Sequence, residues 1–228
     1  MASFHDIDTA SNDGAGTSLA APGIDVTAGD LVCVFGKWEG AADSGATVSY
    51  AGVTVNNQAD GPTINRTAGA ASGDLSQRCW YGKAASTGTL TATLNTASRP
   101  FRKIVAASAT PAASTELVFD ASNTAQGQST TPSAGNVTNA GAGFAFASFG
   151  EYSTVVLTAG TDWTVGIGNP VGSSLVTEYR ALTTGGTITC NGTTGSSDPD
   201  WTAIGIAFKE QSVSAPVTAF PIVGRMGF

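Results

Sequence analysis

The chain has 228 residues, of which 41% are hydrophobic and only 12% are charged, and its formal net charge is −7 with a sequence pI near 4.4. An acidic surface repels nucleic acid and gains nothing from anionic lipid, so neither nucleic acid nor a membrane is expected as a partner. The charged fraction is about half that of an average globular protein. It indicates a surface that is solvated by hydroxyl groups and backbone, or one that is covered by neighbouring molecules.

The first 23 residues are polar and rich in glycine, which predicts an N-terminal arm over residues 1–23 that joins the body near Pro22 and Gly23. This segment has no basic stretch followed by an apolar one, so we expect no signal peptide and synthesis in a reducing cytoplasm. No segment approaches the ~20 apolar residues that span a bilayer. Three widely spaced cysteines (Cys33, Cys79 and Cys190) then predict reduced, structural thiols, although a disulfide between two of them stays open.

Short apolar alternations predict strands in the next part of the chain. The first, residues 30–38, is almost continuously apolar, which is typical of a strand that is buried on both faces or lies centrally in a sheet. A hairpin with a glycine at its turn follows at 47–55. Further strands are predicted at 75–83, 89–94 and 103–108.

Residues 109–141 hold a single short apolar run, and they predict either a long crossover or a pair of weak edge strands. Strand patterns return at residues 144–149, 163–167, 175–182, 187–190 and 201–208. No amphipathic helix is indicated. About eleven to thirteen short strands with frequent turns predict an all-β sandwich or barrel, which we place at residues 24–211.

The last segment, residues 212–228, differs in kind because it combines two prolines with several large apolar side chains. Such a segment is not expected to stay in water, and it either packs back on its own domain or docks onto another chain. We expect an apolar C-terminal arm that binds a partner through Phe220, Ile222, Val223, Met226 and Phe228.

Four segments carry a resemblance to known proteins: residues 29–40, residues 79–85, Glu178 to Arg180, and residues 200–209. Their order resembles that of a group of jelly-roll-like β sandwiches encoded by bacteriophages and bacteria. The resemblance implies a jelly-roll-like β-sandwich and a structural module of a virion or a cell surface, with no catalytic residues to carry over. The central stretch departs from the pattern because it lacks the stronger apolar strands of the group.

The sequence contains few candidate catalytic residues. The single histidine, His5, lies in the predicted arm, where a rigid general base is hard to hold, so neither a Ser-His-acid triad nor a zinc site is expected. We therefore expect no enzyme, no cofactor and no metal. Two alternatives stay open at this point: a calcium site in the loop with Asp198 and Asp200 or near residues 12–14, and a carboxylate pair for glycoside hydrolysis.

The candidates for that carboxylate pair are Glu39, Glu116, Glu151 and Glu178. Glu178 has Arg180 on the same face of its predicted strand, which favours a solvated ion pair. Glu39 follows a tryptophan at a strand end and looks more like a site residue.

Glycan binding would use exposed aromatic rings with polar neighbours. Most tryptophans and tyrosines occupy alternating strand positions and are expected to pack inside. Tyr152 and Trp163 bracket a loop, and they are the predicted glycan-binding residues.

Taken together, these patterns predict a non-enzymatic structural protein of a tailed bacteriophage virion, most specifically a capsid decoration or cement protein. It would be located in the virion, form a homotrimer, and bind the major capsid protein or another virion protein. The alternative is a tail, neck or head-fibre protein with a carbohydrate-binding β-sandwich. A polysaccharide hydrolase is the third hypothesis.

Overall fold

Two five-stranded antiparallel sheets lie at the centre of the computed structural model, which describes residues 1–40, 42–67, 74–166, 173–195 and 200–213. The first central sheet has the order β1-β9-β4-β7-β6: β1 (Ser3–Asn12), β9 (Arg102–Thr110), β4 (Leu31–Glu39), β7 (Asp74–Ala84) and β6 (Val55–Thr67). The second central sheet has the order β10-β18-β12-β15-β14: β10 (Thr115–Gln128), β18 (Asp200–Ser212), β12 (Gly143–Val155), β15 (Ser173–Leu182) and β14 (Thr164–Val165).

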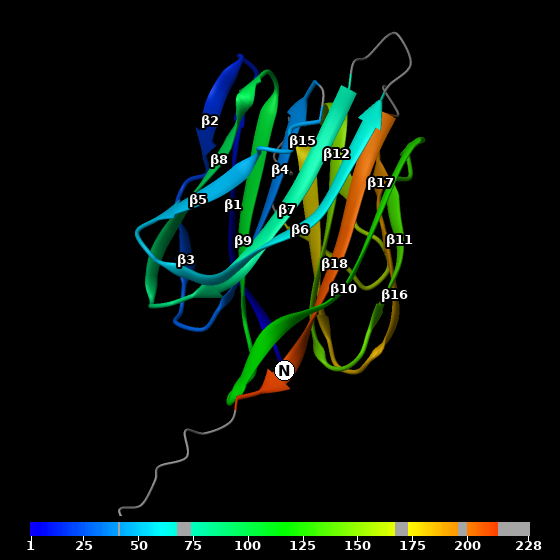
Figure 1. Cartoon of the computed structure of the whole chain (residues 1–228). Coiled ribbons are helices and arrows are strands. Elements are labelled where there is room, and N and C mark those ends of the chain that lie inside the picture. The colour runs from blue at the N-terminus through cyan, green and yellow to red at the C-terminus, as the bar shows by residue number, and fades with distance from the viewer. Residues whose placement is uncertain (41, 68–73, 167–172, 196–199, 214–228) are drawn as a thin grey trace, which may run out of the picture.

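An outer layer covers the far face of each central sheet, which gives the four layers seen side by side in Figure 1. In the N-terminal outer layer, β8 (Gly88–Arg99) pairs with β2 (Gly16–Ala20), β3 (Ile24–Val26) and β5 (Thr47–Ala51). The C-terminal outer layer pairs β11 (Ser133–Asn139) with β16 (Gly186–Asn191), and β13 (Leu157–Thr158) with β17 (Thr193–Thr194). The all-β sandwich prediction is confirmed. The described residues contain eighteen strands, more than the predicted number.

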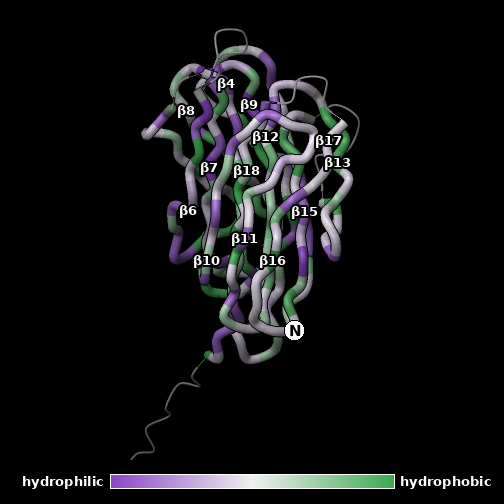
Figure 2. Tube along the Cα trace, turned by 90° about the vertical axis from the view of Figure 1, so that its right-hand side faces the viewer, coloured by the Kyte–Doolittle hydropathy of each residue, from purple (hydrophilic) through white to green (hydrophobic). Residues whose placement is uncertain are grey.

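Three hydrophobic cores fill the spaces between the four layers, and we name them the N-terminal, central and C-terminal cores. The strand β4 contributes side chains to two of these cores. Its even-numbered residues Val32 and Val34 lie in the N-terminal core, whereas the odd-numbered Cys33 and Phe35 lie in the central core. Alternate side chains of a strand point to opposite faces, so the nearly continuous apolar run correctly predicted a strand buried on both faces. Figure 2 shows hydrophobic segments of β12 and β18 behind the paler strands β11 and β16.

The two halves of the chain, residues 3–110 and 115–212, have corresponding strand orders. In each central sheet the first strand of the half pairs with the last strand of the same half, β1 with β9 and β10 with β18. On its other side the last strand pairs with β4 in the first half and with β12 in the second half. The correspondence continues in the outer layers, where β8 pairs with β2 and β5 as β16 and β17 pair with β11 and β13. Matching glycines even open β8 and β16, with φ of 157° at Gly88 and 153° at Gly186.

Irregularities in the first strands also correspond. The ladder between β1 and β9 shifts between Phe4 and Asp6, and the ladder between β10 and β18 shifts between Phe119 and Ala121. In both strands one residue stays unpaired directly after a phenylalanine. A bulge is a local, conformationally specific feature, so its recurrence at the same place supports an internal structural repeat.

The repeat also appears in reciprocal ring contacts across the central core. Phe4 of the first half stacks on Tyr179 of the second, with ring centroids 4.2 Å apart and an interplanar angle of 10°. Phe119 of the second half stacks on Tyr81 of the first at 5.6 Å and 13°. Each half thus offers the same pair of rings to the other, as two subunits do at a two-fold interface.

The predicted N-terminal arm is wrong, because most of residues 1–23 belong to the sandwich. β1 pairs with β9 from Ser3 to Asn12, and its Ile7 lies in the central core. The polar composition that suggested an arm reflects an edge strand whose remaining side chains are largely half-buried or exposed. Residues 109–141 form β10 and β11, which are edge strands, so the second interpretation of this stretch is confirmed. Of the C-terminal arm, residues 214–228 lie outside the described residues.

Candidate functional site at one end of the central core

A buried lysine lies where the central core changes from apolar to polar. Lys37 follows Phe35 on the same face of β4, and its side chain is fully buried. The Lys37 ammonium donates to Glu39 Oε1 at 3.2 Å and to Ser174 Oγ at 3.1 Å. Burial disfavours the charged amine and lowers the pKa of Lys37 to about 8, although the Glu39 carboxylate acts in the opposite direction.

A hydrogen-bonded network of neutral side chains lies beside Lys37, between the two central sheets. Gln77 Nε2 donates to Ser148 Oγ at 2.9 Å, and Thr202 Oγ1 donates to Gln77 Oε1 at 3.0 Å. Thr177 Oγ1 also donates to Ser148 Oγ, at 3.3 Å. All four side chains are fully buried. Because each finds a partner, the network fixes the relative position of the sheets without the cost of unpaired buried groups.

The structure brings two of the sequence-predicted residues to this place. Lys37 Nζ lies 6.0 Å from the ring centroid of the half-buried Tyr152, near the outer limit for a cation–π contact. Burial raises the pKa of Tyr152, and the Glu39 carboxylate adds to this effect. The Lys37 amine, the Glu39 carboxylate, the Ser174 hydroxyl and the Tyr152 phenol are side-chain groups of the kinds that act in catalysis. However, Lys37 is fully buried and Ser174 is only 5% exposed, so neither group faces solvent and a structural role is favoured.

Glu178 does not form the ion pair that the sequence suggested. Its side chain is fully buried and accepts the N–H of Gly160 at 3.0 Å, while Arg180 pairs with Asp162 at 3.2 Å. Burial raises the pKa of Glu178 to about 8, although the hydrogen bond from Gly160 lowers it. Glu178 shares a strand face with residues of the C-terminal core, whereas Glu39 is bonded to Lys37. The two carboxylates therefore do not form a pair for glycoside hydrolysis.

Trp163 is not an exposed ring. Only 7% of its surface is accessible, it belongs to the C-terminal core, and its Nε1–H donates to the carbonyl oxygen of Thr189 at 3.0 Å. The expected exposure of the Trp163 ring is therefore wrong, because this ring packs inward against β16. The predicted partner-binding residues Phe220, Ile222, Val223, Met226 and Phe228 lie outside the described residues.

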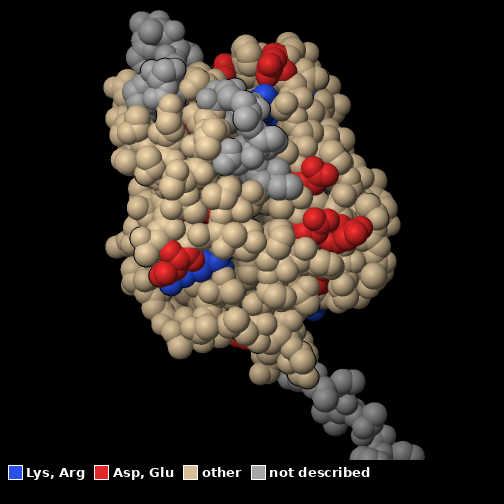
Figure 3. Space-filling view, turned by 180° about the vertical axis from the view of Figure 1, so that it is seen from behind, with Lys and Arg blue, Asp and Glu red and all other residues tan. Residues whose placement is uncertain are grey.

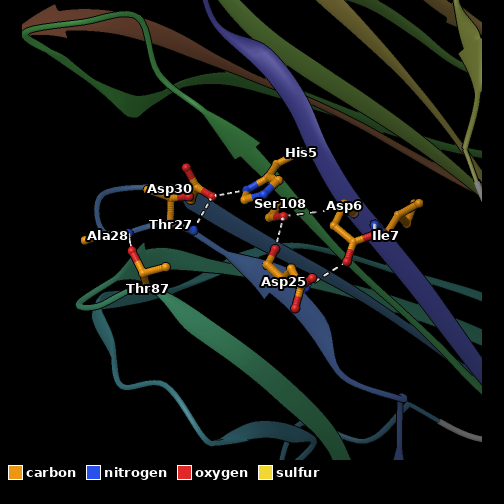
Figure 4. A network of polar contacts seen from close by, with 9 residues as sticks. All are labelled: His5, Asp6, Ile7, Asp25, Thr27, Ala28, Asp30, Thr87 and Ser108. Carbon is orange, nitrogen blue, oxygen red and sulfur yellow. Dashed lines mark hydrogen bonds and ion pairs between the residues drawn. The ribbon is translucent and has the colours of Figure 1, made fainter.

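The single histidine has a structural role (Figure 4). His5 Nδ1 lies 2.5 Å from Asp30 Oδ2, which also accepts the N–H of Thr27 at 2.7 Å. Ser108, the buried hydroxyl close by, donates to the carbonyl oxygen of Asp25 at 3.1 Å. The imidazole therefore joins the bulge of β1 to the turn before β4, and no Ser-His-acid arrangement occurs in this network.

The two loops considered for calcium offer few free carboxylates. Asp200 pairs with Arg66 at 2.6 Å, and Asp13 pairs with Lys103 at 3.0 Å. Asp198 lies outside the described residues. Within the described ranges, no group of three or more His, Cys, Asp or Glu side chains is arranged to hold a metal ion.

A cleft that the sequence did not predict lies at the edge of the N-terminal sandwich. Two adjoining hollows of about 250 and 390 Å³ share Val48, Tyr50 and Gln58. We name them together the β5–β6 cleft, and its walls include Thr47, Asp60, Trp80 and Tyr81. The alternation in the sequence assigned these aromatic residues to packing. Nothing local in the sequence indicates that β5 and β6 separate into different layers.

Comparisons with family models, with curated proteins and with solved structures found no match. Among the described residues, no helix is long and apolar enough to cross a membrane. The sheet topology places the chain in the class of all-β sandwich proteins, with four layers.

Proposed function

We propose that the chain is a non-enzymatic structural protein of a tailed bacteriophage virion, and more specifically a capsid decoration or cement protein. The resemblance of its strand motifs to phage β sandwiches led to this proposal. The main support is the nature of the surface. In the view of Figure 3 most of the face carries neither positive nor negative side chains. An uncharged face of hydroxyl and backbone groups can be covered by a neighbouring protein without desolvating charges.

The few cations of the chain are largely used within the chain itself. Of the nine Lys and Arg residues in the described ranges, seven form ion pairs with carboxylates of the chain: Lys37, Arg66, Arg78, Lys83, Lys103, Arg180 and Lys209. Little positive charge is left for an anionic partner such as nucleic acid or an acidic membrane surface. This distribution favours a protein partner.

Jelly-roll connectivity is part of the proposal. It is supported by the strand order of the central sheets, in which the first strand of each half lies beside the last. We further propose a homotrimer on the major capsid protein, with the apolar C-terminal arm as the docking segment.

The test uses capsids of the encoding phage from which accessory proteins have been stripped. We expect the purified protein to bind these capsids to saturation and to raise their resistance to heat, and we expect density for three copies in a cryo-EM reconstruction. A variant that lacks residues 216–228 is expected to bind more weakly. Absence of the protein from purified virions, together with no binding to stripped capsids, would overturn the proposal.

A second candidate is a tail, neck or head-fibre protein that binds surface polysaccharide. The observation that favours it is the β5–β6 cleft with its aromatic walls. Localisation of the protein by immunogold labelling of whole particles separates this candidate from the first.

A further inference from the structure

We propose that the β5–β6 cleft is a binding site for a neutral oligosaccharide. The site involves Tyr50 and Trp80 as the aromatic groups and Gln58 and Asp60 as the polar groups, with the Arg78 guanidinium beside the Trp80 ring. It is a different site from the predicted glycan residues Tyr152 and Trp163. The inference does not depend on where in a virion the protein resides.

The cleft exists because consecutive strands enter different layers. β5 pairs with β8 in the N-terminal outer layer, whereas β6 pairs with β7 in the first central sheet. The turn between them contains Gly52 at φ 84°, where a Cβ atom would collide with the carbonyl oxygen of Thr89. A glycine is therefore required for this crossing. The edge of the sandwich stays open between the two strands.

The internal repeat shows that this opening is an elaboration of one half. The strands that correspond to β5 and β6 in the C-terminal half are β13 and β14, which have two residues each. β5 and β6 have 5 and 13 residues. Long walls around a polar and aromatic hollow are thus specific to the N-terminal half, although the underlying sandwich does not require them.

Two polar atoms of the lining residues lack partners in the protein. Tyr50 Oη and Trp80 Nε1 are buried and make no hydrogen bond, and Trp80 is only 4% exposed. Buried donors without partners are unfavourable and rare, and they call for a ligand or an ordered water. Their position among residues that line a cleft points to hydroxyl groups of a ligand, since a hydroxyl both donates and accepts.

The remaining groups favour a sugar that carries no charge. Asp60 and Arg78 neutralise each other at 2.7 Å, and the Arg78 guanidinium lies 5.3 Å from the Trp80 ring. Gln58 uses its amide N–H on the carbonyl oxygen of Val55 at 2.9 Å, which leaves its amide oxygen as an acceptor. Aromatic faces bind the C–H surfaces of sugars, and planar polar side chains bind their hydroxyls. An anion would find no unpaired cation here.

The experiment measures binding of neutral hexasaccharides (β-glucan, α-glucan, chitin and mannan fragments) to the full chain by saturation-transfer NMR and calorimetry. A heparin hexasaccharide serves as the anionic probe. We expect at least one neutral hexasaccharide to bind. Tyr50→Phe, which removes only the unpartnered hydroxyl, should weaken that binding about 3- to 10-fold.

Asp60→Ala changes a side chain that is 66% exposed, so the fold should tolerate it, and it should weaken binding by a similar factor. Tyr179→Phe, the same chemical change on β15 and outside the cleft, should leave affinity unchanged. Thermal unfolding of each variant checks that the fold is kept. Three results would overturn the proposal: no binding of any neutral hexasaccharide, binding of heparin alone, or equal affinity in wild type, Tyr50→Phe and Asp60→Ala.

Discussion

Two buried ionisable side chains have pKa values near 8 for the same physical reason, since burial penalises the charged form of each. For Lys37 the pKa falls from 10.5, and for Glu178 it rises from 4.5. Their effects on stability occupy separate pH ranges. The lowered pKa of Lys37 means that the unfolded chain binds more protons between about pH 8 and 10.5, so the free energy of unfolding rises with pH there.

Glu178 acts with the opposite sign at lower pH. Its raised pKa means that the folded chain binds more protons between about pH 4.5 and 8, so the free energy of unfolding falls as pH rises through that range. Glu178→Gln removes the charge and keeps an acceptor for the Gly160 N–H. We expect this variant to be more stable than wild type by about 3–5 kcal/mol at pH 8.5 and nearly equal at pH 4.5, as urea unfolding at both pH values will measure.

The matched control is Glu116→Gln, a half-buried surface carboxylate that pairs with Lys83. This control should keep the wild-type decline between pH 4.5 and 8. If Glu178→Gln declines with pH as steeply as wild type, Glu178 is not buried as the structure has it.

Trp201 is one of two tryptophans in the C-terminal core. It is 7% exposed, its Nε1–H donates to Ser129 Oγ at 3.1 Å, and a Cβ on Gly127 would lie 2.5 Å from its ring. Trp201→Ala should lower the free energy of unfolding by about 3–5 kcal/mol. Chemical denaturation measures this change, and a loss below about 1 kcal/mol would contradict the packing described.

Among the strands, those with many buried apolar side chains were predicted from the sequence, whereas an edge strand was missed. β4 was predicted from sequence because its side chains are apolar on both faces, and β18 because Ile204, Ile206 and Phe208 alternate with small residues. β1 was missed because an edge strand needs few apolar side chains, and its pairing partner β9 lies about a hundred positions away. Distant pairing leaves no local trace in a sequence.

The candidate site was predictable only in part, for the same reason. Glu39 and Tyr152 were singled out from sequence, and the structure places both beside Lys37. Lys37 itself gave no signal: it lies within the predicted strand 30–38, but a lysine side chain is rarely fully buried and is not expected to enter a core. The β5–β6 cleft depends on which layer each strand joins, which is a property of the tertiary fold.

The reciprocal ring contacts allow a test of the repeat at the element level. In double-mutant cycles, Phe4→Ala with Tyr179→Ala and Phe119→Ala with Tyr81→Ala should each show a favourable coupling of about 0.5–1.5 kcal/mol. The second value should be the smaller, because Phe119 is 42% exposed. Urea unfolding of the six variants gives both couplings. A coupling near zero in the first pair would contradict the stacking described across the central core.

For the whole molecule, the first quantity to measure is the mass in solution. Size exclusion with light scattering of the full chain and of a variant without residues 216–228 tests the proposed homotrimer and the role of its apolar arm. We expect a trimer for the full chain and a smaller species for the variant, which should keep its thermal unfolding midpoint because β18 ends at Ser212. A large drop in the unfolding midpoint would instead assign the arm to the sandwich.

The pairing of first and last strands within each half has a consequence for how the chain folds during synthesis. β1 can pair with β9, and the N-terminal core can close, as soon as residues 3–110 have left the ribosome. Until β12 and β18 follow, the central-core face of the first sheet, with Phe35 and Val105, stays uncovered. Two nascent chains could associate through this face, because in the folded chain it packs against the second central sheet, which has a corresponding strand order. Rapid completion of the second half therefore protects the first from misassembly.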